Sequence, residues 1–485
     1  MNRRVDTEEA IQHGILLAKQ GMLHKALALF KGILQTHPHE PRALINAALI
    51  FNTLGEKNKA LALLQHCTQI APSLPDAHYF LGTVYLQNNC YTEAYNAFRS
   101  AITCDIEYNP AYEGLQKALS AMGKSIPVDS SDIVFYTGGL PFHGKTMEET
   151  GLGGSESALI YMARSIASNG LRVRVYCNCN QPGNYDGVEY SNLTDFHIYR
   201  KLHTFPILIS SRSLLPFKFD LKARKRILWI HDDTNVAFLE KENPATLPID
   251  KIFSISQWQR NEWSNYFGIP KERFFLTRNG VDLTIFAPGE KRYKNRLIYF
   301  SRPNRGLNIL LELFPHIRNE VPDAELHIFT YHVPEDENIE SFLYQLKRPG
   351  IFIYGSLTKK DLAQEIAQSR LMVYPSTFRE TSCMAAIESQ ATGTPVVAST
   401  LAALPETIID NVSGRLIPGD PHSSEFKTNF INMVIYLLKN NTEWERLSKG
   451  AQDRCKQHYD WKIIAKEWIS ELTKENTYEN INMRY

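Results

Sequence analysis

Residues 371–388 read LMVYPSTFRETSCMAAIE, and no other part of the chain indicates the architecture as clearly. The apolar run from Leu371 to Tyr374 predicts a buried strand, which Pro375 and Ser376 bring to an end. A helix of small residues is expected to begin at about Ser382, whose hydroxyl stands where an N-cap belongs. A strand that turns directly into a helix is typical of a parallel α/β sheet.

Two carboxylates in this stretch, Glu380 and Glu388, stand eight positions apart. Eight helical residues cover about 12 Å, which is comparable to the reach from a nucleotide's ribose to its sugar. The N-terminus of a helix also offers unpaired N–H groups to an anion. The stretch therefore predicts a clamp with a carboxylate at each sugar-like end and amides on the phosphates between them. From the pair alone, glycoside hydrolysis remains an equal alternative.

Composition describes an ordinary globular protein. At 485 residues the chain is too long for one core, so about two to four domains are expected. A net charge of +1 gives no reason to expect nucleic acid or an anionic membrane as a partner. No apolar signal core follows the first residue, and no apolar run approaches membrane-spanning length. The seven cysteines lack paired spacing, which predicts reduced thiols and a cytoplasmic location.

The first third of the chain carries a 34-residue repeat. Alanines recur at this interval in two series, Ala26, Ala60 and Ala94, and Ala43, Ala77 and Ala111. Gly21 and Gly55 mark the turn inside each unit, and Asn89 takes that place in the third. The pattern resembles tetratricopeptide repeats and predicts an α-solenoid over residues 1–124, with a capping helix at 112–122. Its concave face is expected to receive a partner or acceptor, with a rigid spacer or a homodimer surface as the alternative.

From residue 128 onward the pattern alternates between strands and helices. A strand at 132–136, a helix at 155–168 and a strand at 172–176 predict the first unit of a doubly wound sheet. Further strands are expected at 207–209, 227–230, 252–256, 296–300, 325–329, 351–354, 371–374 and 395–398. We therefore predict two Rossmann-like domains with a cleft between them. Their expected bounds are 128–288 and 289–440, and helices over 441–485 are expected to close the pair.

Three further groups are expected at that cleft. Arg302 and Arg305 follow the first strand of the second domain, where guanidinium groups can hold a pyrophosphate and offset leaving-group charge. Gly153 and Gly154 lie between the first strand and helix, so their amides are placed to meet a phosphate or sugar. His231 ends another strand and can hydrogen-bond a sugar hydroxyl or the reacting centre.

A metal site is not expected. The aspartates after His231, Asp232 and Asp233, are not accompanied by a further ligand cluster with useful spacing. We therefore predict no metal and no cofactor, the nucleotide sugar being a substrate.

Taken together, these residues identify a resemblance. From about residue 132 to 474 the chain resembles the GT-B retaining glycosyltransferases of family 4. The acidic pair, the glycine loop and the cleft histidine of that family match Glu380 with Glu388, Gly153-Gly154, and His231, and its segment leading into the second domain matches 279–282. One departure concerns the basic loop, where family members carry glycine, arginine and a later lysine. Here Ser301 precedes Arg302, and Arg305 replaces the lysine at shorter spacing, so the charge is kept while the spacing differs.

The resemblance implies a role for each residue. The catalytic group would be His231, Glu380, Arg302 and Arg305. The donor-binding residues would be Gly153, Gly154, Arg302, Arg305, Tyr354, Gly355, Glu380, Ser382, Cys383, Met384 and Glu388. Glu380 would hold the sugar hydroxyls and Glu388 the ribose, while the amides of residues 382–384 would receive phosphate and Tyr354-Gly355 would lie near the base. The arginines would stabilise the departing nucleoside diphosphate.

The sequence thus predicts a metal-independent, retaining, hexosyltransferase-type enzyme that uses a nucleotide sugar. A UDP-sugar is the expected donor and a GDP-sugar the alternative. The acceptor is expected to be a glycan, a lipid-linked saccharide or a protein, received through the repeats. Peripheral membrane contact and homodimerisation stay open. Two other readings also stay open: an interaction scaffold with an inactive transferase-like body, and a phosphorylase of the same fold.

Overall fold

The computed structural model describes residues 2–124, 130–201, 203–234, 242–330 and 347–474. The chain forms two compact units, the first of Met1–Asp129 with Thr194–His203 and the second of Ser130–Leu193 with Thr204–Tyr485. The polypeptide therefore crosses between the units three times. Among the described residues, no helix combines the length and the apolar character that crossing a bilayer requires.

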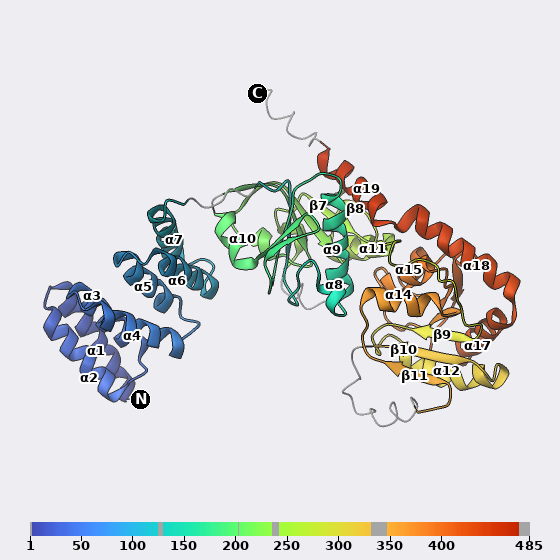
Figure 1. Ribbon diagram of the computed structural model, residues 1–485, viewed down its shortest axis with the longest axis horizontal. Helices are drawn as coiled ribbons and strands as arrows, with labels where there is room; N and C mark the ends of the chain where they lie inside the picture. The colour runs from blue at the N-terminus through green and yellow to red at the C-terminus, as the bar shows by residue number, and fades with distance from the viewer. Residues whose placement is uncertain (1, 125–129, 202, 235–241, 331–346, 475–485) are drawn as a thin grey trace. The chain divides into compact units, whose positions relative to one another are not determined.

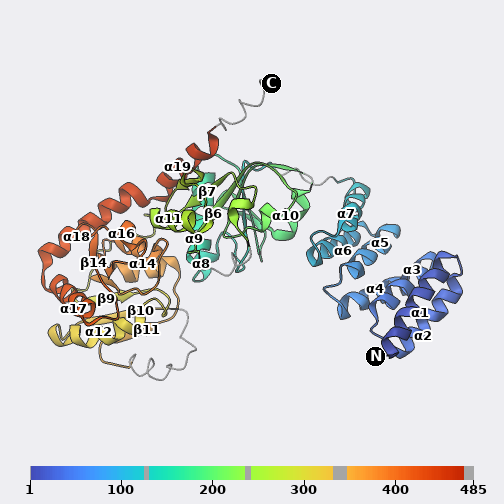
Figure 2. The ribbon, with the colours of Figure 1, turned by 180° about the vertical axis from the view of Figure 1, so that it is seen from behind.

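The first unit is a stack of helix pairs, coloured blue in Figures 1 and 2. Its helices are α1 (Asn2–Lys19), α2 (Leu23–Thr36), α3 (Pro41–Thr53), α4 (Lys57–Ile70), α5 (Pro75–Gln87), α6 (Tyr91–Cys104) and α7 (Asn109–Ala121). Gly21, Gly55 and Asn89 have φ values of 78°, 82° and 62°. The left-handed backbone that ends the first helix of each pair therefore occurs where the repeat pattern predicts it.

Small residues let the repeat helices approach closely. A Cβ atom at Gly82 of α5 would lie 2.8 Å from the ring of Phe98, and one at Gly114 of α7 would lie 2.5 Å from it. Phe98, on α6, is buried between these two helices. A larger residue at either glycine would force the helix pair apart, since interiors are close-packed.

One helix of the first unit comes from elsewhere in the chain. Helix α10 (Leu193–Arg200) lies in sequence between two strands of the second unit, yet it packs on α6 and α7. Ile198 belongs to their apolar core, and Asp195 pairs with Arg99 at 2.9 Å. The buried Arg200 pairs with Glu107 and donates to the Ile106 carbonyl at 3.2 Å. No local pattern in residues 193–200 predicts this contact.

The second unit contains two sheets. The first has eight strands in the order β3-β4-β2-β1-β5-β6-β7-β8, parallel except for the β3–β4 pair. Its strands are β1 (Ile133–Thr137), β2 (Val173–Cys177), β3 (Gly183–Tyr185), β4 (Val188–Asn192), β5 (Thr204–Ser211), β6 (Lys222–Ile230), β7 (Lys251–Ser254) and β8 (Phe274–Leu276). Helices α8 (Thr146–Glu149), α9 (Gly154–Ala167) and α11 (Gln257–Phe267) accompany it.

The second sheet has six parallel strands in the order β11-β10-β9-β12-β13-β14. They are β9 (Arg296–Tyr299), β10 (Glu325–Phe329), β11 (Ile351–Tyr354), β12 (Leu371–Tyr374), β13 (Val396–Ser399) and β14 (Gly414–Ile417). Its helices are α12 (Leu307–Glu320), α14 (Lys359–Ala367), α15 (Met384–Ala391), α16 (Leu404–Thr407), α17 (Ser424–Lys439) and α18 (Asn441–Arg454). The predicted α-solenoid followed by a GT-B pair of parallel sheets is therefore confirmed, and each expected strand is present. The predicted domain bounds stay a prediction.

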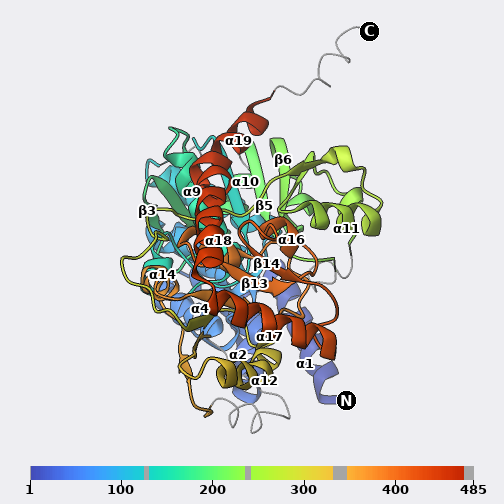
Figure 3. The same cartoon turned by 90° about the vertical axis from the view of Figure 1, so that its right-hand side faces the viewer.

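The last helix returns to the first sheet. In Figure 3, α19 (Trp461–Thr473) runs beside α9, with which it is in contact. Trp461 and Trp468 are buried in the core of the first sheet, and Trp468 donates to Thr277 Oγ1 at 2.6 Å. Tyr459 is buried in the core of the second sheet. These aromatic residues tie the C-terminal helices to both sheets.

Candidate active site

A cavity of about 940 Å³ opens in the second unit and is lined from both sheets. Ten of the predicted site residues lie in its lining: Gly153, Gly154, His231, Arg302, Arg305, Glu380, Ser382, Cys383, Met384 and Glu388. The carboxyl ends of parallel strands, where α/β proteins bind their ligands, supply most of them. Residues more than 200 positions apart are thus brought to one place.

The Glu380 carboxylate is buried in the turn between β12 and α15. Its Oε1 atom accepts hydrogen bonds from Arg305 Nη1 at 2.8 Å and from the Tyr374 hydroxyl at 2.5 Å. Burial raises the pKa of Glu380, and the charge of Arg305 opposes that rise. Burial also disfavours the Arg305 charge, but Glu380 outweighs it and raises the pKa of Arg305. We conclude that the two groups form a buried ion pair.

The start of α15 differs from the prediction. The helix begins at Met384 with Cys383 as its N-cap, and no side chain caps it, whereas a hydroxyl cap at Ser382 was expected. Glu380 precedes the helix, as it did in the expected arrangement, and the helix itself begins two residues later than expected. The nearby Thr381 hydroxyl donates instead to the His231 carbonyl at 2.6 Å, which ties this turn to the first sheet.

Glu388 lies on α15, with its side chain buried. Its Oε1 atom forms an ion pair with Lys359, the first residue of α14. Lys359 also lines the cavity, and the sequence analysis missed it. It follows the end of β11 by a few residues, so the rule that identified the two arginines would also have found it.

The basic loop after β9 is held close to β12. The Tyr299 hydroxyl donates to the Arg302 carbonyl at 2.7 Å, and the Arg305 guanidinium lies 4.3 Å from the centre of the Phe378 ring. Gly306 has φ 97°, and a Cβ atom there would lie 2.0 Å from the Pro375 carbonyl oxygen. Only glycine fits this approach, so it fixes the loop beside the Glu380 turn.

The glycine turn of the first sheet meets the second sheet across the cavity. Gly153 is the N-cap of α9, and Gly154 is its first residue. A Cβ atom at Gly154 would lie 3.4 Å from Met384 Sδ, and one at Gly151 would lie 3.1 Å from Ser356 Cβ. The two sheets therefore close on each other at this point, with the amino end of a 14-residue helix toward the cavity.

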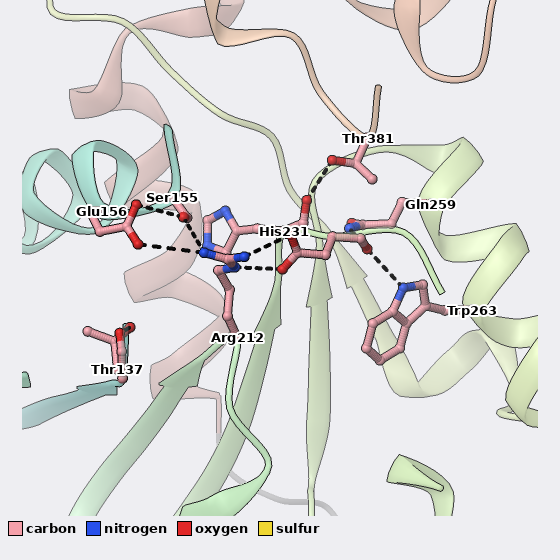
Figure 4. A network of polar contacts seen from close by, with 10 residues as sticks. Thr137, Ser155, Glu156, Arg212, His231, Gln259, Trp263 and Thr381 are labelled. Atoms are coloured by element: carbon pink, nitrogen blue, oxygen red, sulfur yellow. Dashed lines mark hydrogen bonds and ion pairs between the residues drawn. The ribbon is translucent and has the colours of Figure 1, made fainter. Parts of the chain in front are cut away.

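His231 stands at the end of β6, beside the polar network shown in Figure 4. Burial, with a contribution from the Arg212 charge, lowers the pKa of His231 to about 3. The imidazole is therefore neutral at physiological pH, and its buried Nε2 has no hydrogen-bond partner among the described residues. A neutral ring nitrogen can donate to a hydroxyl or accept from one, according to the tautomer.

Tyr354 and Gly355 are not among the residues that line the cavity. The Tyr354 ring stacks on that of Phe329, with the centroids 4.7 Å apart, and its hydroxyl lies 3.3 Å from His327 Nδ1. Their immediate neighbours, Ser356 and Leu357, do line it. The expected contact of Tyr354 and Gly355 with the base stays a prediction.

Comparison with known proteins places two parts of the chain in families. Residues 294–440 match the family described as Glycosyl transferases group 1, and residues 41–74 match the Tetratricopeptide repeat. The chain is 27% identical over 242 residues to the MMP alpha-(1->4)-mannosyltransferase of Mycolicibacterium hassiacum, a match that covers 49% of this chain and 57% of that protein. The chain spans about half the length of such curated relatives.

Two solved structures share the fold. Sucrose-phosphate synthase from Thermosynechococcus elongatus aligns with a TM-score of 0.56 and 15% identity, over 73% of this chain and all of that one. The Anabaena protein HepE, in complex with UDP-glucose, aligns with a TM-score of 0.55 and 15% identity, over 70% of this chain and 99% of that one. With the family matches, these similarities confirm the resemblance seen in the sequence. Residues 294–440 are therefore similar to the group 1 glycosyltransferases, and residues 41–74 to the tetratricopeptide repeat.

Proposed function

We propose that this chain transfers a hexosyl group, with retention of configuration and without a metal ion, from a nucleotide sugar to an acceptor hydroxyl. One observation carries the proposal: two buried carboxylates, Glu380 and Glu388, line one cavity opposite the glycine turn and His231. Each is held through its Oε1 atom by a cation, Arg305 or Lys359. Each therefore keeps a second oxygen with which to accept a hydrogen bond from a substrate hydroxyl.

The two carboxylates act separately. Glu380 receives the hydroxyls of the donor sugar, and Glu388 receives those of the ribose, as the family resemblance implies. The cations orient the carboxylates and offset part of the cost of burying their charge. A joint acid and base role of the kind found in glycoside hydrolysis would need one of the pair to carry a proton.

The diphosphate leaves toward the basic loop and the start of α15. The bond between C1 of the sugar and the phosphate oxygen breaks, and the acceptor oxygen bonds to C1 on the same face. The acceptor's proton passes to the departing phosphate oxygen, so no protein base is required. Arg302 and Arg305 offset the charge that develops on the leaving group, and the amides of residues 382–384, which line the cavity, receive phosphate oxygens.

His231 has the properties of a hydrogen-bond partner for the donor sugar. Its neutral imidazole brings no charge near C1, where positive charge develops during transfer. Its Nε2, without a partner in the part of the chain that the structure describes, can be satisfied by a sugar hydroxyl. Its backbone carbonyl accepts a hydrogen bond from the Thr381 hydroxyl, which holds the histidine and the Glu380 turn at a fixed separation.

The donor and the setting are proposed at a coarser level. The named relative is a mannosyltransferase, and HepE was solved with UDP-glucose, so UDP-glucose and GDP-mannose are the first donors to test. We further propose that the repeats receive the acceptor, whether a glycan, a lipid-linked saccharide or a protein. A cytoplasmic location and a homodimer remain proposals of the same kind.

The test is a thermal-shift screen of the full chain with UDP-, GDP- and ADP-sugars, with the nucleoside diphosphates alone as controls. A ligand that binds the native state raises the melting temperature by mass action. We expect one nucleotide series to stabilise the wild type, and Glu388→Gln to lose most of that shift. No shift and no turnover with any donor would leave a repeat-based scaffold with an inactive transferase body.

A further inference from the structure

The part of the cavity lining that comes from the first sheet, here called its wall, carries an excess of negative charge. The charged side chains described there are Glu156, Arg212, Asp232 and Asp233. This wall therefore has three carboxylates and one guanidinium. His231, which lies beside them, is neutral at physiological pH because its pKa is lowered to about 3.

The guanidinium of Arg212 is fully engaged by this wall. Its Nε and Nη2 atoms donate to Asp232 at 2.5 and 3.0 Å, and its Nη1 atom donates to Ser155 Oγ at 3.0 Å. Nη1 also lies 3.5 Å from Glu156 Oε1. Figure 4 shows the side chain between the start of α9 and the end of β6. One positive charge is therefore shared by two carboxylates.

The other cation near this wall is shared in the same way. Arg379, from the turn of the second sheet, lies 3.3 Å from Asp233 and also forms an ion pair with Glu262. Its guanidinium packs over the Trp258 ring at 4.9 Å. Each guanidinium at this wall is thus divided between two carboxylates.

The facing wall has the opposite balance. The second sheet contributes four cations and two carboxylates to the cavity lining: Arg302, Arg305, Lys359 and Arg379, with Glu380 and Glu388. A diphosphate is attracted to this wall and repelled by the other, because like charges at close range are strongly unfavourable.

We propose that this polarity sets the acceptor class: the end of the acceptor that reacts is a neutral saccharide, and it carries no phosphate near its reacting hydroxyl. The inference rests on the proposed transfer reaction and narrows its acceptor. A phosphate ester would bring about two negative charges to a wall where each cation is already shared. The hydroxyls of a neutral sugar can instead donate to Glu156, Asp232 or Asp233.

The test measures nucleoside diphosphate release by the full chain with UDP-glucose or GDP-mannose and matched acceptors. The pairs are glucose with glucose 6-phosphate, mannose with mannose 6-phosphate, and glycerol with glycerol 3-phosphate. The measured quantity is the increase in nucleoside diphosphate release over the rate without acceptor. We expect this increase to be at least about tenfold larger with each neutral acceptor than with its phosphate. The inference would be overturned if a phosphorylated acceptor raised release as much as its neutral partner, or if neutral and phosphorylated acceptors gave the same release.

A charge variant gives the second measurement. Asp233→Asn removes one carboxylate and leaves Arg379 paired with Glu262 alone, so the activity with phosphate acceptors relative to neutral ones should rise about tenfold. Glu312→Gln, an exposed charge change on α12 outside the cavity, should leave the ratio unchanged. An equal ratio in Asp233→Asn and wild type would count against the inference. Failure of every donor to bind or turn over would contradict the proposed function itself, and with it this inference.

Discussion

Arg305 and Glu380 are 75 residues apart in sequence, yet the arginine Nη1 atom donates to the carboxylate Oε1 atom at 2.8 Å. The exposed fraction of the Glu380 side chain is only 5%, so its charge depends on this partner. The contact joins the loop after β9 to the turn after β12, two neighbouring strands of the second sheet. The basic and acidic elements of the site therefore act as one structural unit.

Removing the arginine should destabilise the second unit. In Arg305→Ala the Glu380 charge is left buried without its cation, and we expect a loss of about 3 kcal/mol in the free energy of unfolding. All six tryptophans lie in the second unit, so denaturant unfolding followed by tryptophan fluorescence reports on that unit alone. Adding Glu380→Gln should recover much of the loss without restoring turnover. Arg305→Lys is the control, and equal losses in Arg305→Ala with and without Glu380→Gln would contradict the ion pair.

Lys359 should support nucleotide binding through Glu388. In Lys359→Ala the carboxylate loses its only ion-pair partner among the described residues, so its orientation toward the ribose is lost. We expect the KM for the nucleotide sugar to rise about tenfold or more, an effect of roughly 1.4 kcal/mol, with a smaller change in kcat. Lys359→Arg keeps the charge, and its KM should lie between those of the wild type and Lys359→Ala. An unchanged KM in Lys359→Ala would show that Glu388 does not depend on this lysine.

Much of the site could be predicted because parallel strands end at one edge of a sheet. That rule joined Arg302, Arg305 and the Glu380 turn, although they are far apart in sequence. The same rule applies to Lys359, which follows the end of β11. The exact helix start could not be predicted, because a hydroxyl such as that of Ser382 is only a candidate cap, and no side chain caps α15.

The contact of α10 with the repeats was not accessible from the pattern. Nothing local in residues 193–200 indicates that their partners lie about 90 positions earlier. Such packing depends on which surfaces meet in the folded chain, and the local sequence does not indicate that pairing. The repeats themselves were predictable because their period repeats within the chain.

His231 should make the stability of the second unit depend on pH. Its pKa is about 3 in the folded chain and is expected near the ordinary 6.5 when unfolded, so only the unfolded chain takes up a proton below pH 6.5. The stabilisation is complete above pH 6.5 and is lost as the pH falls toward 3. From pH 7.5 to pH 5 this costs about 2 kcal/mol. His231→Gln should remove that part of the dependence, measured by tryptophan fluorescence in urea at both pH values. Identical pH dependence in both proteins would contradict a buried neutral histidine.

Arg200 should stabilise the first unit and leave the second unchanged. Its side chain is buried and is bonded to Glu107 and to the Ile106 carbonyl, so Arg200→Ala should cost about 1–2 kcal/mol. Far-ultraviolet circular dichroism would report the loss of the repeat helices. Tryptophan fluorescence, confined to the second unit, should not move. Lys201→Ala, a change at a more exposed neighbour, is the control and should cost less. A shift of the fluorescence transition with no change in the helical signal would contradict the assignment of α10 to the first unit.

The central claim is that the cavity holds a nucleotide-sugar donor whose sugar is bound by Glu380. The most direct test is the rate of nucleoside diphosphate release from the stabilising donor, compared between wild type and Glu380→Gln at equal folded fraction. We expect turnover by the wild type and a rate at least about 100-fold lower in the variant, since one charged contact to the transition state contributes about 3 kcal/mol. Equal rates in the two proteins would contradict it.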